Sequence, residues 1–122
     1  MASCSLTIPP ETEQVRLARL VACAAARRLG VSEQEVDEVR LAVGEAVGRA
    51  VVRHQRAGKT EPVTVRIVDD VHSLSVDVVD RVAGRDDGDF GLAEAVITGL
   101  VPGAELHDSA EGGSVLRMSW RI

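Results

Sequence analysis

The stretch Val39-Arg-Leu-Ala-Val-Gly-Glu45-Ala-Val-Gly-Arg49-Ala-Val-Val-Arg-His54 decides the fold, because its apolar residues recur with the period of an α-helix. One apolar stripe of this helix comprises Val36, Val39, Val43, Val47, Ala50 and His54. A second stripe, on the far side, comprises Leu41, Gly48 and Val52. A helix that is apolar on two faces is predicted to be covered on both. Glu45 lies beside the second stripe, so its carboxylate either lines a pocket or pairs with Arg49 one turn later.

Composition limits the class of protein. The 122 residues are 45% hydrophobic and 27% charged, which is typical of one globular domain, here residues 1–122, with its own core. The formal net charge of -5 argues against nucleic-acid binding, because contacts to phosphates need a basic patch. No apolar run has the length of a membrane span, and residues 1–10 do not resemble a signal peptide. We therefore expect a cytoplasmic protein that does not bind membranes.

The two cysteines are not arranged as metal ligands or as a disulfide framework. Cys23 lies in an alanine-rich helical segment and is expected to be a small core thiol. Cys4 is expected in a frayed N-terminus. Neither has metal-ligating neighbours, so no metal site is predicted.

Capping and turn signals divide the chain into alternating elements. Gly30 is expected to end the first helix, and Ser32 followed by Glu35 forms a capping box that begins the second. After the polar segment 55–62 the apolar period changes to two, which is typical of strands. The predicted helices are 11–29, 32–55 and 91–101, and the predicted strands are 5–8, 63–68, 74–80, 104–108 and 116–122. The sequence therefore predicts an α+β two-layer sandwich in which three helices cover one face of a mainly antiparallel sheet.

Asp80 is the second unusual carboxylate. It shares strand parity with Leu74, Val76 and Val78, which places it on the helix-covered side of the sheet. A charge without a partner is costly there, so Asp80 either meets a donor or begins an exposed turn. His54, at the end of the helical stripe, is interpreted as a packed or capping imidazole.

Four motifs now stand in order along the chain: Asp37–His54, Val78–Gly84, Phe90-Gly91-Leu92 and Gly112–Trp120. With the order of predicted elements, they resemble the anti-sigma factors and serine-protein kinases of partner-switching systems, within the superfamily of histidine-kinase-like ATPases. The resemblance covers nearly the whole chain. The run Arg40-Leu-Ala-Val-Gly-Glu-Ala46 further resembles actinobacterial proteins that work beside developmental anti-anti-sigma factors.

The resemblance implies roles for individual residues. Glu45 matches the carboxylate that activates the attacking hydroxyl as a general base. Asp80 matches the residue that binds the adenine amino group, and Gly84 matches a point where the backbone passes close to the base. Gly91 and Leu92 open the helix whose N-terminal amides would face phosphate oxygens.

Several residues depart from the family's pattern. Arg49 stands where the motif has an asparagine that helps to hold Mg²⁺, and a guanidinium offers donors but no lone pair for a metal. Val82 stands at the central glycine of the second motif. The loop that follows carries more acidic than basic residues, which would repel a triphosphate; these are Asp86, Asp87 and Asp89 against Arg81 and Arg85. Together these departures predict an impaired nucleotide site.

Two functions follow from the resemblance, and a third reading does not depend on it. The first is an anti-sigma-type regulator that binds a sigma factor, an anti-anti-sigma protein or both, with a degenerate nucleotide site and no cofactor. The alternative is an active kinase that uses ATP and Mg²⁺ to phosphorylate a serine of an anti-anti-sigma factor. The third is an unrelated α+β interaction domain.

The first helix is the candidate partner-binding surface. The resemblance implies that the first strand and first helix form a homodimer and much of the sigma-factor contact. Arg16 and Arg19 lie beside apolar residues of this helix, a composition favoured at interfaces. The alternative is that these arginines only keep a packed helix soluble.

Overall fold

The computed structural model describes residues 2–84, 90–110 and 112–122, and for residues 90–94 it describes the backbone alone. The described strands form one antiparallel sheet of five strands in the order β1-β2-β3-β5-β4. These strands are β1 (Ala2–Ile8), β2 (Val63–Asp70), β3 (Ser73–Asp80), β4 (Glu105–Asp108) and β5 (Ser114–Arg121). The described helices are α1 (Val15–Arg28), α2 (Glu33–Arg56) and α3 (Phe90–Leu100), and a 3-10 turn, η1 (Thr12–Gln14), precedes α1.

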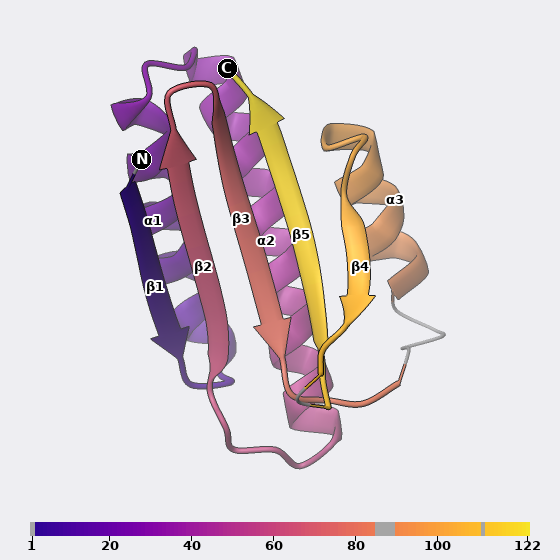
Figure 1. Ribbon diagram of the computed structural model, residues 1–122. Helices are drawn as coiled ribbons and strands as arrows, with labels where there is room; N and C mark the ends of the chain where they lie inside the picture. The colour runs from indigo at the N-terminus through magenta and orange to yellow at the C-terminus, as the bar shows by residue number, and fades with distance from the viewer. Residues whose placement is uncertain (1, 85–89, 111) are drawn as a thin grey trace.

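The helices lie on one face of the sheet (Figure 1). α2 lies behind the central strands β3 and β5, α1 lies behind β1 and β2, and α3 lies on the β4 side. The predicted fold class, a two-layer α+β sandwich with three helices on one face, is therefore confirmed.

α2 is the centre of the core. Every member of its first predicted stripe is buried, namely Val36, Val39, Val43, Val47, Ala50 and His54. The stripe packs against strand residues of the same parity, including Val65, Leu74 and Met118. The predicted covering of the second stripe is wrong at Leu41, which is half exposed because α1 and α3 flank α2 without closing over it.

The helix ends follow the predicted capping chemistry. The Ser32 hydroxyl accepts a hydrogen bond from the Glu35 amide at 3.2 Å, so the capping box begins α2 as predicted. Gly30 has a φ of +80°, the left-handed conformation that ends a helix. The first predicted helix differs at its start, because residues 12–14 form a 3-10 turn whose capping residue Glu11 makes no side-chain bond.

The first strand is longer than predicted. Residues from Ala2 to Ile8 pair with β2, and the Ala2 amide also donates to Asp69 Oδ1 at 3.0 Å. Cys4 is thus exposed in an ordered edge strand, and the prediction of a frayed terminus around it is wrong. Its small and polar neighbours gave no strand pattern, and pairing with β2 supplies the order that their propensity lacks. Cys23 is buried in the core as predicted.

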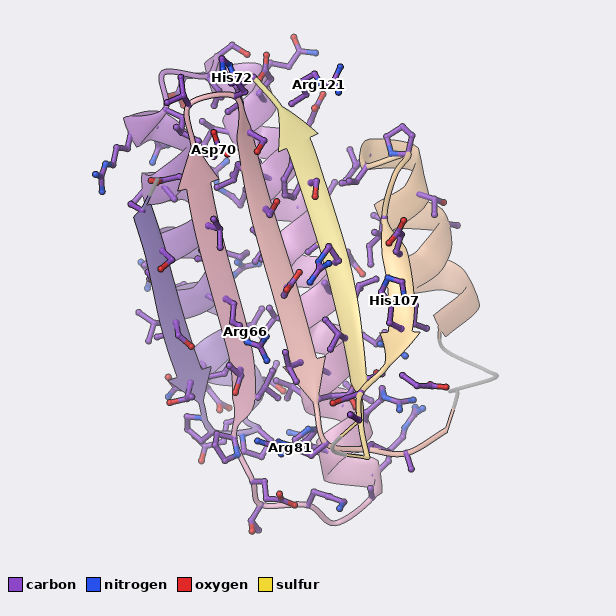
Figure 2. The ribbon with its side chains drawn as sticks, viewed as in Figure 1. Arg66, Asp70, His72, Arg81, His107 and Arg121 are labelled. Carbon is purple, nitrogen blue, oxygen red and sulfur yellow. The ribbon has the colours of Figure 1, made fainter. Side chains whose placement is uncertain are left out.

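The face of the sheet away from the helices is polar. Arg66 in β2 and His107 in β4 belong to this face, and both are exposed (Figure 2). Asp77 in β3 lies between Arg66 and Arg117 in the strand register and is bonded by Arg117 at 2.8 and 3.0 Å. This hydrogen bond, and then the charge of Asp77, raises the pKa of Arg117. The alternation of apolar and polar residues in the strands therefore corresponds to a covered and an open face.

Candidate functional site

The candidate site lies where β3 ends, beside the C-terminal half of α2 and the start of β5. Asp80 is the last residue of β3, and its side chain points to the helix-covered side with 1% of the residue exposed. This burial confirms the predicted side of the sheet and excludes the alternative of an exposed turn. Oδ1 accepts a hydrogen bond from the Val82 amide at 2.9 Å, and Oδ2 accepts one from the Ser114 hydroxyl at 2.6 Å.

Two arginines of α2 face the same carboxylate. Arg53 Nε lies 3.3 Å from Asp80 Oδ2, and Arg49 Nη1 lies 3.8 Å from the same oxygen. Both arginine side chains are almost fully buried, one helical turn apart. The attraction between opposite charges is strong where water is excluded, so Asp80 offsets much of the desolvation of the two guanidinium groups.

Arg53 also reaches the backbone beyond β3. We call residues Arg81–Gly84 the exit segment. Arg53 Nη2 donates to the carbonyl oxygens of Val82 and Gly84, at 2.8 and 2.7 Å. Its Nε lies within ion-pair distance of Asp80 but out of line for a hydrogen bond. One side chain of α2 therefore contacts the end of β3 and the segment that leaves it.

The predicted ion pair between Glu45 and Arg49 is not formed. Among the residues that the structure describes, Glu45 takes part in no ion pair, and it is only half buried. The buried guanidinium of Arg49 lies near Asp80 because a charge removed from water gains most from a counter-charge that is also removed from water. Glu45 keeps contact with solvent.

His54 fixes the start of the exit segment. Its Nε2 accepts a hydrogen bond from the Arg81 amide at 3.0 Å, and its Nδ1 lies 2.9 Å from the Glu61 carbonyl oxygen. A carbonyl can only accept, so Nδ1 carries the proton and the imidazole is neutral. His54 is fully buried, which confirms the interpretation of a packed imidazole.

Gly113 allows β5 to approach the end of β3. A Cβ at this position would lie 1.8 Å from the backbone oxygen of Asp80, where no real side chain fits. The approach places Ser114 directly opposite Asp80 in the strand register. Gly84 is a glycine for a different reason, because its φ of +82° is a conformation that other residues rarely adopt.

The structure adds residues to the predicted site and leaves others untested. Arg53 and Ser114 were missed; Arg53 follows Arg49 by one helical turn, which was a usable signal, whereas Ser114 needed the strand register. Gly91 and Leu92 lie in the first turn of α3, and their contacts with a phosphate stay a prediction. The predicted acidic loop, with Arg85, Asp86, Asp87 and Asp89, lies outside the described residues.

Within the described ranges, no group of three or more His, Cys, Asp and Glu side chains could hold a metal ion. Over the same part of the chain, no helix has the length and apolarity needed to cross a membrane.

The candidate partner surface lies on the outer side of α1. Arg16 is exposed, and the aliphatic part of Arg19 crosses Gly44 of α2, where a Cβ would meet Arg19 Cδ at 3.0 Å. Leu17 and Leu20 are exposed to 43% and 55%. Neither Arg16 nor Arg19 makes an ion pair within the described residues. Their cationic heads therefore have no acidic partner in the part of the chain that the structure describes.

The arginines at the other end of α1 are engaged. Arg27 bonds to Glu33 at 3.3 and 3.4 Å, and this hydrogen bond raises the pKa of Arg27. Arg28 Nε lies 3.9 Å from Asp69 Oδ2. Beside Arg28, an open cavity of about 220 Å³ separates α1 from β1 and is lined mainly by small residues, including Ala2, Cys4, Ala24 and Ala25.

The described sheet is backed by three helices, and a carboxylate at the end of β3 faces the central helix. This arrangement agrees with one known domain family. Residues 8–120 match the histidine kinase-like ATPase domain, and the chain belongs to this family. The family-level resemblance inferred from the motifs is therefore confirmed; the actinobacterial subgroup stays a prediction.

The chain is similar to two known proteins. It is 27% identical over 108 residues to the serine-protein kinase RsbW of Bacillus subtilis (strain 168), an alignment that covers 88% of this chain and 66% of that protein. The chain thus spans slightly less than two thirds of that relative. Its fold matches the structure of the RsbU and RsbW domains of Rv1364c from Mycobacterium tuberculosis, with a TM-score of 0.77 and 17% identity, over 99% of this chain and 32% of that one.

Proposed function

We propose that this chain is an anti-sigma-type regulator of partner switching in the cytoplasm. It recognises a sigma factor, an anti-anti-sigma protein or both through its surface, and its nucleotide site is degenerate. Similarity to a serine-protein kinase named RsbW supports the partner-switching class. The observation that carries the degenerate site is that two buried arginines of α2, Arg49 and Arg53, face Asp80.

The residues of the site do not fit ATP and Mg²⁺ in the manner that the family resemblance implies. An adenine amino group would have to share Asp80 with groups of the chain, since Oδ1 accepts from Val82 and Oδ2 accepts from Ser114 and faces Arg53. On the metal side, Arg49 supplies only donors, so it cannot ligate Mg²⁺. We therefore propose that the regulator needs no nucleotide cofactor.

The outer side of α1 is the proposed contact for partners. Exposed Leu17 and Leu20 supply apolar area, and Arg16 and Arg19 supply cationic heads, so the surface suits a partner that is apolar with an acidic rim. β1 lies next to this surface as an edge strand of the sheet. It carries no charged residue and no proline, which are the residues that usually keep an edge strand from pairing with another strand. A homodimer is proposed at this edge.

The partner surface can be tested by charge reversal. We expect Arg16→Glu together with Arg19→Glu to weaken binding to a sigma factor or an anti-anti-sigma domain from the native host by about tenfold or more, since each reversal replaces attraction with repulsion. Arg66→Glu on the open face of the sheet is the matched control. Calorimetry measures both affinities. Unchanged affinity in the double variant, or loss in the control alone, contradicts the proposed surface.

The nucleotide site is tested by titrating the unmodified chain with ATP and Mg²⁺ in a calorimeter. We expect weak binding or none. A low micromolar dissociation constant, or nucleotide retained through purification, would overturn the proposal of a degenerate site.

The active kinase remains a second candidate because of Glu45. Its carboxylate is half buried and takes part in no ion pair among the described residues, so it is available as a general base. If this function holds, purified chain should transfer phosphate from ATP to a serine of an anti-anti-sigma domain, and Glu45→Gln should abolish the transfer. A radiolabel assay decides between the two candidates.

A further inference from the structure

The guanidinium of Arg53 lies in a site whose walls are hydrogen-bond acceptors of the same chain. The acceptors are the carbonyl oxygens of Val82 and Gly84 and the carboxylate of Asp80, and all three lie within 3.3 Å of Arg53 nitrogens. Carbonyl and carboxylate oxygens arranged in this way bind a planar group with several N–H donors. The guanidinium of Arg53 has that chemistry, and its side chain is 3% exposed.

Neutralising Asp80 does not explain this geometry. Arg49 already lies near Oδ2, and the hydrogen bonds to Oδ1 and Oδ2 come from Val82 and Ser114. Within the part of the chain that the structure describes, the hydrogen bonds of Arg53 go to the exit segment and none goes to the carboxylate. The position of the guanidinium therefore serves the backbone of residues 82–84 as well as the charge balance.

We propose that Arg53 is a built-in ligand that fixes the conformation of the exit segment without any external molecule. This inference rests on the proposed degenerate site and deepens it: the acceptors at the end of β3 are permanently occupied from within the chain. Arg53 is a positioning residue. It acts on the Arg81 and Val82 amides, which bond to His54 and Asp80, by holding the carbonyls that follow them.

The test is chemical rescue of a variant that lacks the guanidinium. Arg53→Met keeps an unbranched apolar stem in the core, and Arg53→Ala leaves a space of the right chemistry for a free guanidinium ion. Amide hydrogen exchange of the full chain is followed by NMR at Arg81 and Val82, with Val76 and Val78 of β3 as internal references. Arg66→Ala, which removes an exposed arginine of β2, is the matched control.

We expect exchange at Arg81 and Val82 to accelerate by about tenfold or more in both Arg53 variants, while the reference amides stay slow. Millimolar guanidinium chloride should restore slow exchange in Arg53→Ala and should leave the unmodified chain and Arg66→Ala unchanged. Arg53→Lys keeps the charge but lacks the planar fork, so its exit segment should exchange as fast as that of Arg53→Met.

Four results would overturn the proposal. These are unchanged exchange in both Arg53 variants, acceleration of all amides alike, equal restoration by sodium chloride, and full protection in Arg53→Lys. If Arg53→Ala does not fold, Arg53→Met and Arg53→Lys decide by the same criteria. The experiment uses neither nucleotide nor partner, so its failure is distinct from failure of the proposed regulatory function.

Discussion

Two regions of this protein have opposite character. At the end of β3, charged side chains are buried: Asp80, Arg49 and Arg53 face one another, and His54 and Ser114 complete the hydrogen bonds. On the outer side of α1, apolar side chains are exposed, with Leu20 more than half accessible. Soluble proteins usually arrange these residue types the other way round.

The two regions differ in whether their side chains are satisfied within the chain. A buried cluster of charges must be satisfied internally and is then unavailable to ligands. An exposed apolar surface is unsatisfied and gains from a partner. The inversion therefore favours a protein that acts through surfaces.

The largest effect is expected from Gly113→Ala, which separates β5 from the end of β3. A Cβ 1.8 Å from the Asp80 backbone oxygen forces both strands to move, so we expect a loss of more than about 4 kcal/mol in the free energy of unfolding. Urea denaturation measures it. Gly48→Ala in α2 is the control, since its Cβ would meet no described atom within 4 Å apart from its chain neighbours and the nearby backbone of its own helix. Helix propensity predicts a gain of up to about 1 kcal/mol. A mild effect at Gly113 would mean that this approach is not needed.

The next effect separates a fully buried ion cluster from an ion pair in which only Asp77 is buried. Asp80→Ala leaves Arg49 and Arg53 buried without their counter-charge and should lower the free energy of unfolding by about 3–5 kcal/mol. Asp77→Ala, in the same strand, removes the partner of Arg117, whose side chain is 54% exposed and regains water; about 1 kcal/mol or less is expected.

Both variants are compared in the same denaturant titration. Equal losses for Asp80→Ala and Asp77→Ala would contradict the distinction between the two regions, because burial of the partner would then have no influence.

Periodic residues made most of the fold predictable. The stripe from Val36 to His54, the capping box at Ser32 and the alternation in β2, β3 and β5 each depend on spacing within one segment, and all are observed. β1 was only partly predicted, because Ala2 to Cys4 carry no pattern and gain their order from β2. Local spacing cannot reveal an element that is stabilised mainly by its neighbour.

The candidate site was predictable in its members but not in their pairing. Spacing placed Asp80 on the covered side and Arg49 on the face of Glu45, and it suggested that these two helical residues pair. The structure pairs Arg49 with Asp80 because tertiary packing brings together two groups that are both removed from water. Ser114 became a site residue only through the register of β3 with β5, which depends on the close approach at Gly113.

The smallest effect on stability is expected on the outer side of α1, and it sharpens the contrast most. Leu17→Gln combined with Leu20→Gln changes exposed side chains on a helix whose core face is untouched, so the free energy of unfolding should change by no more than about 0.5 kcal/mol. Binding to a partner should nevertheless fall, because the apolar area that a partner would cover is lost. Denaturation and calorimetry on the same sample measure the two quantities. A large loss of stability would show that this helix face is already packed within the chain, and unchanged affinity for a recovered partner would show that the exposed leucines are not the contact.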